Sequence, residues 1–371
     1  MNDEIKRLLC ILSSMDAGGA ETFLMKVYRA FDKQKYQMDF CVSNSGAEGF
    51  YDKEILSMGG KIHRSVTKTK KPIRSFISIM NIVKKNKYDR VLRVSQHSLS
   101  SLDLLAAKLG GARRLIYRSS NSNIAGGKIN RLLHWLFKWL PKFVPTIKMA
   151  PSTEAAEFVF GKRDVRKGKV VIFKNAIALD HFLFNQSIRT QTRKEFKIQN
   201  KLVLGHIGRF SYQKNHKFLI DIFNEVCKIH PDAVLMLVGK GELEEDIKRQ
   251  IKNYGLIDKV IFTGIRSDVA NLLMAMDLFV FPSFFEGMPN VVIEAQATGL
   301  PCLISNQITR EANITGLVNY LSITEHPKLW AEKIIILSKN VNRNIDYSQQ
   351  FQKNGYDINL EIEKFIKLIF E

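Results

Sequence analysis

Two glutamates eight residues apart are the first candidates for chemistry in this sequence. Glu286 and Glu294 flank a Gly-Met-Pro turn that follows a predicted strand. We expect a helix to begin near Pro289, because proline suits the first helical turn. The N–H groups of Asn290 and Val291 would then project from the helix start, where a diphosphate binds well. On spacing alone, a second interpretation is equally good: Glu286 is a solvated loop residue, and Glu294 is a favourable charge at the start of a helix.

Two cations upstream favour the ligand-binding interpretation. Arg209 and Lys214 follow a predicted strand at 202–207 and precede a predicted helix at 218–227. Arginine offers a planar fork to two oxygens, and lysine offers a mobile point charge. Each is more often a surface charge when considered singly. Together they predict a clamp that neutralises a leaving diphosphate, with the helix start approaching from the other side.

The surrounding elements alternate short apolar strands with amphipathic helices, which is typical of α/β proteins with parallel sheets. The pattern breaks around 174–192, so we expect two doubly wound domains with ligand at the carboxyl ends of the strands. The first domain covers 1–185 and is completed by a C-terminal helix within 355–371; the second covers 195–350. The predicted strands are 7–14, 40–42, 90–94, 115–117, 170–173, 202–207, 233–238, 260–262, 278–281 and 301–304.

The charge of the chain is uneven. The formal net charge of the 371 residues is +20, and residues 1–190 hold 34 Lys and Arg against 15 Asp and Glu. The remaining residues hold 22 and 21, so nearly all the excess lies in the first half. Such asymmetry indicates an anionic partner, either nucleic acid or a membrane surface. The four cysteines are scattered without a Cys-x-x-Cys pair, which argues against a zinc site and for a reducing compartment.

One segment of the basic half could contact a membrane. Residues 128–142 place apolar side chains at helical spacing, with tryptophan and lysine beside the stripe, as at membrane interfaces. An ordinary helix packed on the first sheet explains the stripe equally well, but the excess charge favours an anionic membrane. We find no secretory signal and no run of about 18 apolar residues, and therefore expect a cytoplasmic protein, peripheral on the inner face of the plasma membrane. The candidate membrane contacts are Lys128, Arg131, Trp135, Lys138, Trp139 and Lys142.

Five motifs in order resemble a known family. They are Gly18-Gly19-Ala20-Glu21, the block 208–215, Val238-Gly239-Lys240-Gly241, Phe262-Thr263-Gly264 and the Glu286…Glu294 segment. Together they resemble the family 4 retaining glycosyltransferases of bacterial capsule and exopolysaccharide synthesis. The resemblance implies a GT-B fold, with two Rossmann-like domains facing a central cleft. It also implies hexosyl transfer from a UDP- or GDP-sugar, held mainly by the second domain, to a glycan or lipid-linked oligosaccharide acceptor held by the first.

The resemblance assigns roles to individual residues. Glu286 would contact the donor sugar and Glu294 the ribose, while Arg209 and Lys214 would bind the diphosphate. Gly18 and Gly19 would let a first-domain loop approach the phosphates without an intervening side chain. The remaining implied donor contacts are Gly264 and Ile265 at the base, and Gly287, Met288, Asn290 and Val291 around the helix start.

The sequence departs from the family at one place. Related chains carry a histidine where this one reads Tyr117-Arg118-Ser119-Ser120-Asn121, and His97 is a substitute candidate, although a lone histidine is more often structural. No Asp-x-Asp motif is present, so we expect no metal and no cofactor beyond the nucleotide-sugar co-substrate. Three alternatives stay open: a GT-B-related nucleotide-sugar epimerase, a basic nucleic-acid-binding α/β protein and an NAD-dependent oxidoreductase. The second lacks a recognition motif, and the third lacks the glycine fingerprint.

Overall fold

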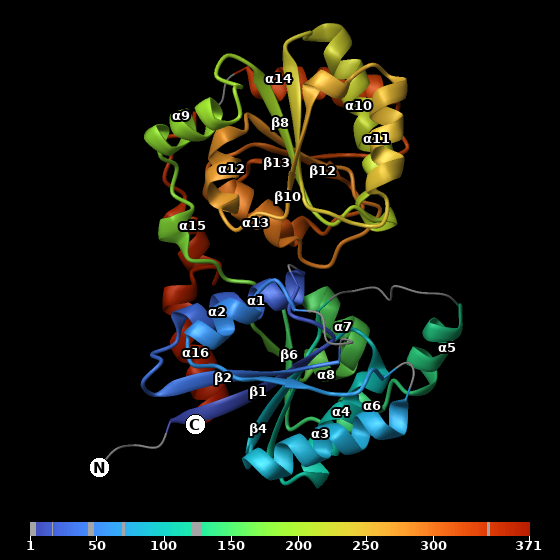
Figure 1. The fold of residues 1–371 in the computed structure, drawn as a ribbon, viewed down its shortest axis with the longest axis vertical. Helices are drawn as coiled ribbons and strands as arrows, with labels where there is room; N and C mark the ends of the chain where they lie inside the picture. Colours follow the sequence, from blue (N-terminus) through green and yellow to red (C-terminus); the bar gives the residue numbers. More distant parts are fainter. Residues whose placement is uncertain (1–4, 17, 44–47, 69–70, 121–127, 340–341) are drawn as a thin grey trace. The chain divides into compact units, whose positions relative to one another are not determined.

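The computed structural model describes residues 5–16, 18–43, 48–68, 71–120, 128–339 and 342–371 (Figure 1). The chain divides into two compact units, Met1–Ile177 with Gly355–Glu371, and Ala178–Asn354. The sequence placed the corresponding boundaries at 185, 195, 350 and 355. Each unit contains one parallel β-sheet, which confirms the prediction of two Rossmann-like α/β domains.

The sheet of the N-terminal unit has the strand order β3-β2-β1-β4-β5-β6-β7, and every pairing is parallel. Its central strands read as continuous apolar runs because helices cover both faces. The strands are β1 (Lys6–Leu12), β2 (Tyr36–Val42), β3 (Ile62–Arg64), β4 (Arg90–Val94), β5 (Arg114–Arg118), β6 (Ile147–Ala150) and β7 (Val171–Ile172).

Two groups of helices enclose this sheet (Figure 1). α3 (Pro72–Asn86), α4 (Ser101–Leu109) and α7 (Thr153–Phe160) share one apolar core with the strands. α1 (Gly19–Ala30) packs on α16 (Ile358–Phe370) through Phe31, whose ring lies 6.1 Å from that of Phe365. The last helix therefore belongs to the N-terminal unit. The other helical segments are α2 (Asp52–Ser57), η1 (Ser98–Ser100), α5 (Lys128–Leu136), α6 (Leu140–Phe143) and α8 (Lys162–Arg166).

The sheet of the C-terminal unit has the order β10-β9-β8-β11-β12-β13, again parallel throughout. Three of its strands have the bounds that the sequence predicts. The strands are β8 (Leu202–Ile207), β9 (Ala233–Val238), β10 (Val260–Gly264), β11 (Leu278–Phe281), β12 (Cys302–Ser305) and β13 (Val318–Leu321).

Helices also cover both faces of this second sheet. α10 (His216–Ile229), α11 (Glu244–Asn253) and α14 (Pro327–Ser338) share a core with it, and in Figure 1 α12 (Val269–Ala275) lies on the opposite side from α10 and α11. The other segments are η2 (Leu179–His181), α9 (Gln186–Glu195), η3 (Tyr212–Lys214), η4 (Ile257–Lys259), α13 (Asn290–Ala297), η5 (Arg310–Ala312) and α15 (Ser348–Lys353).

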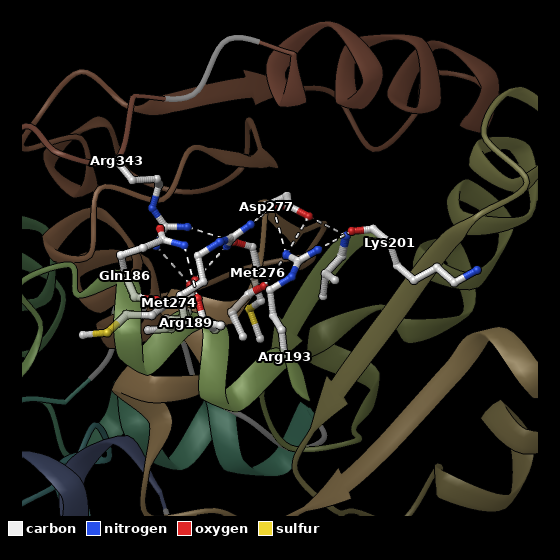
Figure 2. Close-up of polar contacts among 12 residues, drawn as sticks. Gln186, Arg189, Arg193, Lys201, Met274, Met276, Asp277 and Arg343 are labelled. Atoms are coloured by element: carbon white, nitrogen blue, oxygen red, sulfur yellow. Dashed lines mark hydrogen bonds and ion pairs between the residues drawn. The ribbon is translucent and has the colours of Figure 1, made fainter. Parts of the chain in front are cut away.

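Three arginines cap the carboxyl end of α12, where carbonyl groups lack helical partners (Figure 2). Arg189 donates to the carbonyls of Met274 and Met276, at 2.8 and 2.9 Å, and Arg193 pairs with Asp277. Arg343 donates to the Met276 carbonyl at 2.8 Å and is 8% exposed. Cations suit a helix C-terminus, so these side chains fix α9 and the segment before α15 to one helix end.

Candidate active site

The loop after β8 is built by close packing of glycines on backbone. The amide of Phe210 donates to the Lys240 carbonyl at 3.0 Å, and the amide of Leu243 donates to the Phe210 carbonyl at 3.0 Å. A Cβ atom at Gly241 would lie 2.3 Å from the Phe210 carbonyl oxygen, and Gly239 has φ +137°. The Gly-Lys-Gly motif therefore exists to let the loops after β8 and β9 pack backbone to backbone.

The loop after β8 is also joined to the loop between β11 and α13. Asn215 Nδ2 donates to the Pro282 carbonyl at 3.1 Å, and the amide of Phe284 donates to the Gln213 carbonyl at 2.9 Å. Gln213 Nε2 donates in turn to the Phe285 carbonyl at 2.9 Å. Asn215 has φ +54°, a left-handed conformation that asparagine tolerates better than most residues. These bonds fix the side chains of the first loop against Glu286 on the second.

Lys214 and Glu286 form an ion pair between these loops. Nζ lies 2.7 Å from Oε1, and the side chains are only 16% and 8% exposed. Gln213 Nε2 donates to the other carboxylate oxygen at 3.1 Å, and Nζ lies 4.5 Å from the centroid of the Phe281 ring. The lysine stem crosses Gly208, where an added Cβ would lie 3.1 Å from Cε. Lys214, which the sequence predicts to bind a diphosphate, is thus paired with Glu286, which the sequence predicts to bind the sugar. A diphosphate that bound Lys214 would have to replace Glu286 as its partner.

The helix predicted after the Gly-Met-Pro turn is present, but Pro289 is its N-cap rather than its first residue. α13 begins at Asn290, so Asn290 and Val291 supply its first N–H groups, which have no helical acceptor. Glu294 lies one turn further and is 5% exposed. The buried amide of Gln296 fixes this helix, because its Nε2 donates to the Ala312 carbonyl at 2.7 Å. Gly287 and Met288 are buried at the base of the turn.

The other predicted donor residues lie at neighbouring strand ends. Arg209 is exposed and pairs with Glu242 at 3.2 Å. Gly264 has φ +69°, and its carbonyl accepts from the Gly239 amide at 2.9 Å. Ile265 is 44% exposed and follows directly. These residues extend the set from the loop after β8 to the loops after β9 and β10.

Gly18 and Gly19 lie on the N-terminal unit, at the start of α1 after β1. A Cβ atom at Gly18 would lie 2.3 Å from Glu21 Oε2, so the glycine makes room for that carboxylate. Burial, with the negative charge of Asp16, raises the pKa of Glu21 to about 6. Gly18 thus accommodates a carboxyl group of its own unit, a reason for glycine that the sequence did not indicate.

His97 performs a structural task in this fold. Its Nδ1 accepts from the Leu99 amide at 3.3 Å, and its Nε2 donates to the Asn130 carbonyl at 3.0 Å. The ring meets that of His134 edge to face, with centroids 5.7 Å apart. Nδ1 thus caps the short η1 helix, and Nε2 joins the loop after β4 to α5. This geometry favours the structural alternative over a catalytic role for His97.

An arginine occupies the strand end where a histidine was expected. Arg118 is 1% exposed, donates to Asn175 Oδ1 at 2.6 Å, and lies 3.6 Å over the centroid of the Phe23 ring. Burial lowers its pKa to about 9. Ser120 Oγ donates to Gln96 Oε1 at 2.9 Å, while Asn121 falls outside the described residues. The side chains of Arg118 and Ser120 at this strand end therefore contact other residues of the N-terminal unit.

Two features of the C-terminal site escaped sequence reasoning. Tyr212 is 70% exposed and stacks on Phe284, with ring centroids 4.7 Å apart, beside the Lys214–Glu286 pair. Beneath the same loop, the buried rings of His206 and His216 lie 4.6 Å apart, and burial lowers the pKa of both, that of His216 to about 3. Neutral imidazoles add no positive charge beside Lys214. No spacing in the sequence indicates either pair. Tyr212 and Phe284 lie in loops after two different strands, and His206 and His216 lie on a strand and a helix.

Within the described ranges, no group of three or more His, Cys, Asp and Glu side chains could hold a metal ion. Three of the cysteines are buried, Cys227 is partly buried, and all four are free thiols. The polar groups gathered at the β8 and β11 loops are instead a cation, a carboxylate, an amide and a helix start. That combination suits a ligand with an anionic part and hydroxyl groups.

Sequence comparison identifies relatives over most of the chain. Residues 187–357 match the profile described as "Glycosyl transferases group 1". The chain is 33% identical over 340 residues to the putative glycosyltransferase EpsF of Bacillus subtilis, covering 90% of this chain and 88% of that protein. It is 30% identical over 245 residues to an Escherichia coli UDP-Gal:alpha-D-GlcNAc-diphosphoundecaprenol alpha-1,3-galactosyltransferase, covering 64% of this chain and 62% of that one.

Solved structures agree on the fold. Anabaena HepE, crystallised with UDP and glucose, matches with a TM-score of 0.76 at 18% identity, covering 98% of this chain and 99% of that one. WaaG, a glycosyltransferase involved in lipopolysaccharide biosynthesis, matches with a TM-score of 0.74 at 14% identity, covering 98% and 99%. These similarities confirm the predicted GT-B fold.

Proposed function

Because the chain belongs to the group 1 glycosyltransferases, we propose that it moves a hexose from a UDP-sugar to a lipid-linked glycan, with retention of anomeric configuration. The observation that carries the proposal is the Lys214–Glu286 pair, 2.7 Å apart and held beside the start of α13. It puts one cation, one carboxylate and the first N–H groups of a helix within two crosslinked loops. A nucleoside diphosphate joined to a sugar needs all three kinds of group.

The diphosphate would bind between Lys214 and the first turn of α13. The N–H groups of Asn290 and Val291 favour anionic oxygens, and the positive end of the helix dipole adds to that preference. Lys214 would leave Glu286 for a phosphate oxygen, and Arg209 would swing from its exposed pairing with Glu242 to a second one. These groups stabilise the negative charge that develops on the leaving UDP, so the reaction needs no metal ion.

The sugar would then meet the carboxylate that Lys214 releases. Glu286 accepts hydrogen bonds from sugar hydroxyls, and Gln213, which donates to it at 3.1 Å, keeps its orientation. Glu294, 5% exposed on α13, would accept from the ribose hydroxyls, while Gly264 and the exposed Ile265 would line the base. Glu294 therefore contributes to nucleotide affinity, and Glu286 to transfer.

The acceptor we propose is a glycan carried on a lipid diphosphate, in cell-surface polysaccharide synthesis. The E. coli relative is named for a diphosphoundecaprenol substrate, which supports this assignment. The N-terminal half carries the excess of positive charge that an anionic lipid substrate and membrane favour. The enzyme would thus work as a peripheral protein on the cytoplasmic face of the membrane.

A panel of nucleotide sugars tests this proposal. We expect UDP-sugars to raise the thermal midpoint of the wild-type protein, because binding to the folded state stabilises it. Glu286→Ala should keep the UDP-induced rise and abolish transfer. A rise with GDP-sugars alone would move the donor assignment to guanosine. A rise with none of the nucleotide sugars, or normal transfer by Glu286→Ala, would contradict the site.

A further inference from the structure

The outer side of α5, α6 and the turn between them carries six large apolar side chains that are exposed to solvent. Their exposed fractions lie between 49% for Leu136 and 78% for Phe143. Soluble proteins rarely expose contiguous apolar side chains in this number without a partner for them. We call this set the apolar face; it consists of Ile129, Leu132, Trp135, Leu136, Trp139 and Phe143.

The inner side of α5 holds a histidine instead. His134 is 5% exposed, its Nδ1 accepts from the Ser98 amide at 3.2 Å and from the Ser98 hydroxyl at 3.0 Å, and its ring stacks on Phe158 with centroids 5.1 Å apart. A helix that covers a sheet turns its apolar side inward. Here the tryptophans point outward and an imidazole inward, so the alternative that this stripe packs on the first sheet is wrong for the apolar face.

The stretch of chain that contains the apolar face carries charge of one sign. Between Asp103 and Glu154 the chain has no acidic residue and nine lysines and arginines. Of the candidate contacts, Arg131 lies on α5, Lys138 lies in the turn 137–139 that follows it, and Lys142 lies on α6. Lys128 begins α5, and its side chain falls outside the described ones. An apolar face on a segment whose own charges are all positive is complementary to an anionic, partly apolar partner.

A lipid bilayer interface fits this face better than a protein surface. Tryptophan is common at both kinds of interface, but lysine is frequent on helices that lie between acyl chains and headgroups and is depleted at protein interfaces. No helix in the described part of the chain is long and apolar enough to cross a membrane. We propose that the apolar face is a docking surface for an anionic bilayer, with α5 and α6 lying in the interfacial layer; the proposal rests on a lipid-linked acceptor.

The docking surface is joined to the strand ends of the N-terminal sheet. His97 Nε2 donates to the Asn130 carbonyl of α5 at 3.0 Å, and the hydroxyl of Tyr117, on β5, donates to the His97 carbonyl at 2.9 Å. His134 makes the second connection, through Ser98. The two imidazoles act as positioning residues, because they transmit the placement of a bilayer-bound helix to the loops after β4 and β5. Docking therefore favours transfer to a lipid-borne acceptor and leaves UDP affinity unchanged.

Vesicle sedimentation without substrates tests docking separately from catalysis. We expect the wild-type protein to sediment with phosphatidylcholine–phosphatidylglycerol vesicles, and less so at high salt or with phosphatidylcholine alone. Trp135→Glu/Trp139→Glu should lower the partition coefficient at least about 100-fold, since each tryptophan loses its transfer free energy and gains a charge facing anionic lipid. The matched control is Ile257→Glu/Ile336→Glu on the C-terminal unit, where the side chains are 58% and 63% exposed. It should sediment nearly as the wild type does.

Three results would overturn the proposal. One is equal sedimentation of the two double variants, with both shown to be folded by circular dichroism and cooperative melting. Another is a wild-type protein that ignores anionic vesicles. The third is a concentration-dependent dimer that only Trp135→Glu/Trp139→Glu dissociates, since the face would then join two copies of the chain. With a soluble acceptor the tryptophan variant should keep its turnover, and with a vesicle-borne acceptor it should lose it. If the wild-type protein binds vesicles but transfers to neither acceptor, the result would count against the proposed function instead.

Discussion

The ion pair between Lys214 and Glu286 predicts how UDP affinity should respond to a change at each of the two residues. The lysine is bound to a carboxylate 2.7 Å away, so in the proposed site UDP would compete with Glu286 for it. Lys214→Met removes the charge but keeps a stem of similar length across Gly208. Glu286→Gln keeps the shape of the loop and removes the competitor. We therefore expect Lys214→Met to weaken UDP binding and Glu286→Gln not to weaken it.

The magnitudes follow from the contacts that change. A hydrogen bond to a charged group contributes about 1.5–3 kcal/mol, so Lys214→Met should raise the Kd for UDP roughly 10- to 150-fold. Glu286→Gln should leave the Kd unchanged or lower it, because Lys214 no longer leaves a carboxylate. The same variant should lower transfer at least about 100-fold, as expected when a charged group that acts on the reacting sugar is lost.

Isothermal titration with UDP, together with a transfer assay, measures both effects. Lys214→Arg is the matched control, since it keeps the charge and should weaken UDP less than Lys214→Met does. The reasoning fails if Glu286→Gln weakens UDP as much as Lys214→Met does. It also fails if Lys214→Met binds UDP normally, because the diphosphate would then lie elsewhere.

Four further predictions concern the supporting structure. Gly241→Ala should lower the thermal midpoint of the C-terminal unit and weaken UDP, because the new Cβ would meet the Phe210 carbonyl at 2.3 Å; an unchanged midpoint would show that the loops are not so packed. Arg343→Met removes donors to the Met276 and Thr298 carbonyls and should destabilise that unit by about 3 kcal/mol in urea unfolding, whereas a loss under about 0.5 kcal/mol would assign the cap to other residues. Burial lowers the pKa of His134 from 6.5 to about 4, so the contribution of this side chain to stability is complete above pH 6.5 and is lost as the pH falls towards 4. The fluorescence of Trp135 on α5 should change over that range as the helix detaches from Ser98, and a signal that stays constant to pH 4 would contradict this. Transfer should survive EDTA, and loss that magnesium or manganese restores would refute a metal-independent reaction.

Strand positions and the order of the two units were predictable from local pattern. The apolar runs of β8, β9 and β11 are short, continuous and bounded by polar or glycine residues, so their ends coincide with changes in composition. The helix after the Gly-Met-Pro turn was predictable because proline marks a helix start. The helix begins at Asn290 with Pro289 as its N-cap, near the predicted start.

Contacts between distant residues were not predictable in the same way. Gln213 contacts Glu286 across 73 positions, and Arg343 caps a helix that ends 68 positions earlier, at Ala275. Nothing in the local pattern of either residue indicates its partner. The orientation of α5 was equally hidden, because an amphipathic stripe looks the same whether a sheet or a bilayer covers it. The bond from His134 to Ser98 shows which side of α5 faces inward, and Ser98 lies in another element.

Product analysis with a UDP-sugar, in the presence and absence of a lipid-linked glycan, separates a transferase from an epimerase. We expect the enzyme to release one UDP for each hexose added to the acceptor, Glu286→Gln to release almost none, and the donor alone to stay intact. Conversion of the donor into a different nucleotide sugar without any acceptor would identify an epimerase and contradict the proposed transfer.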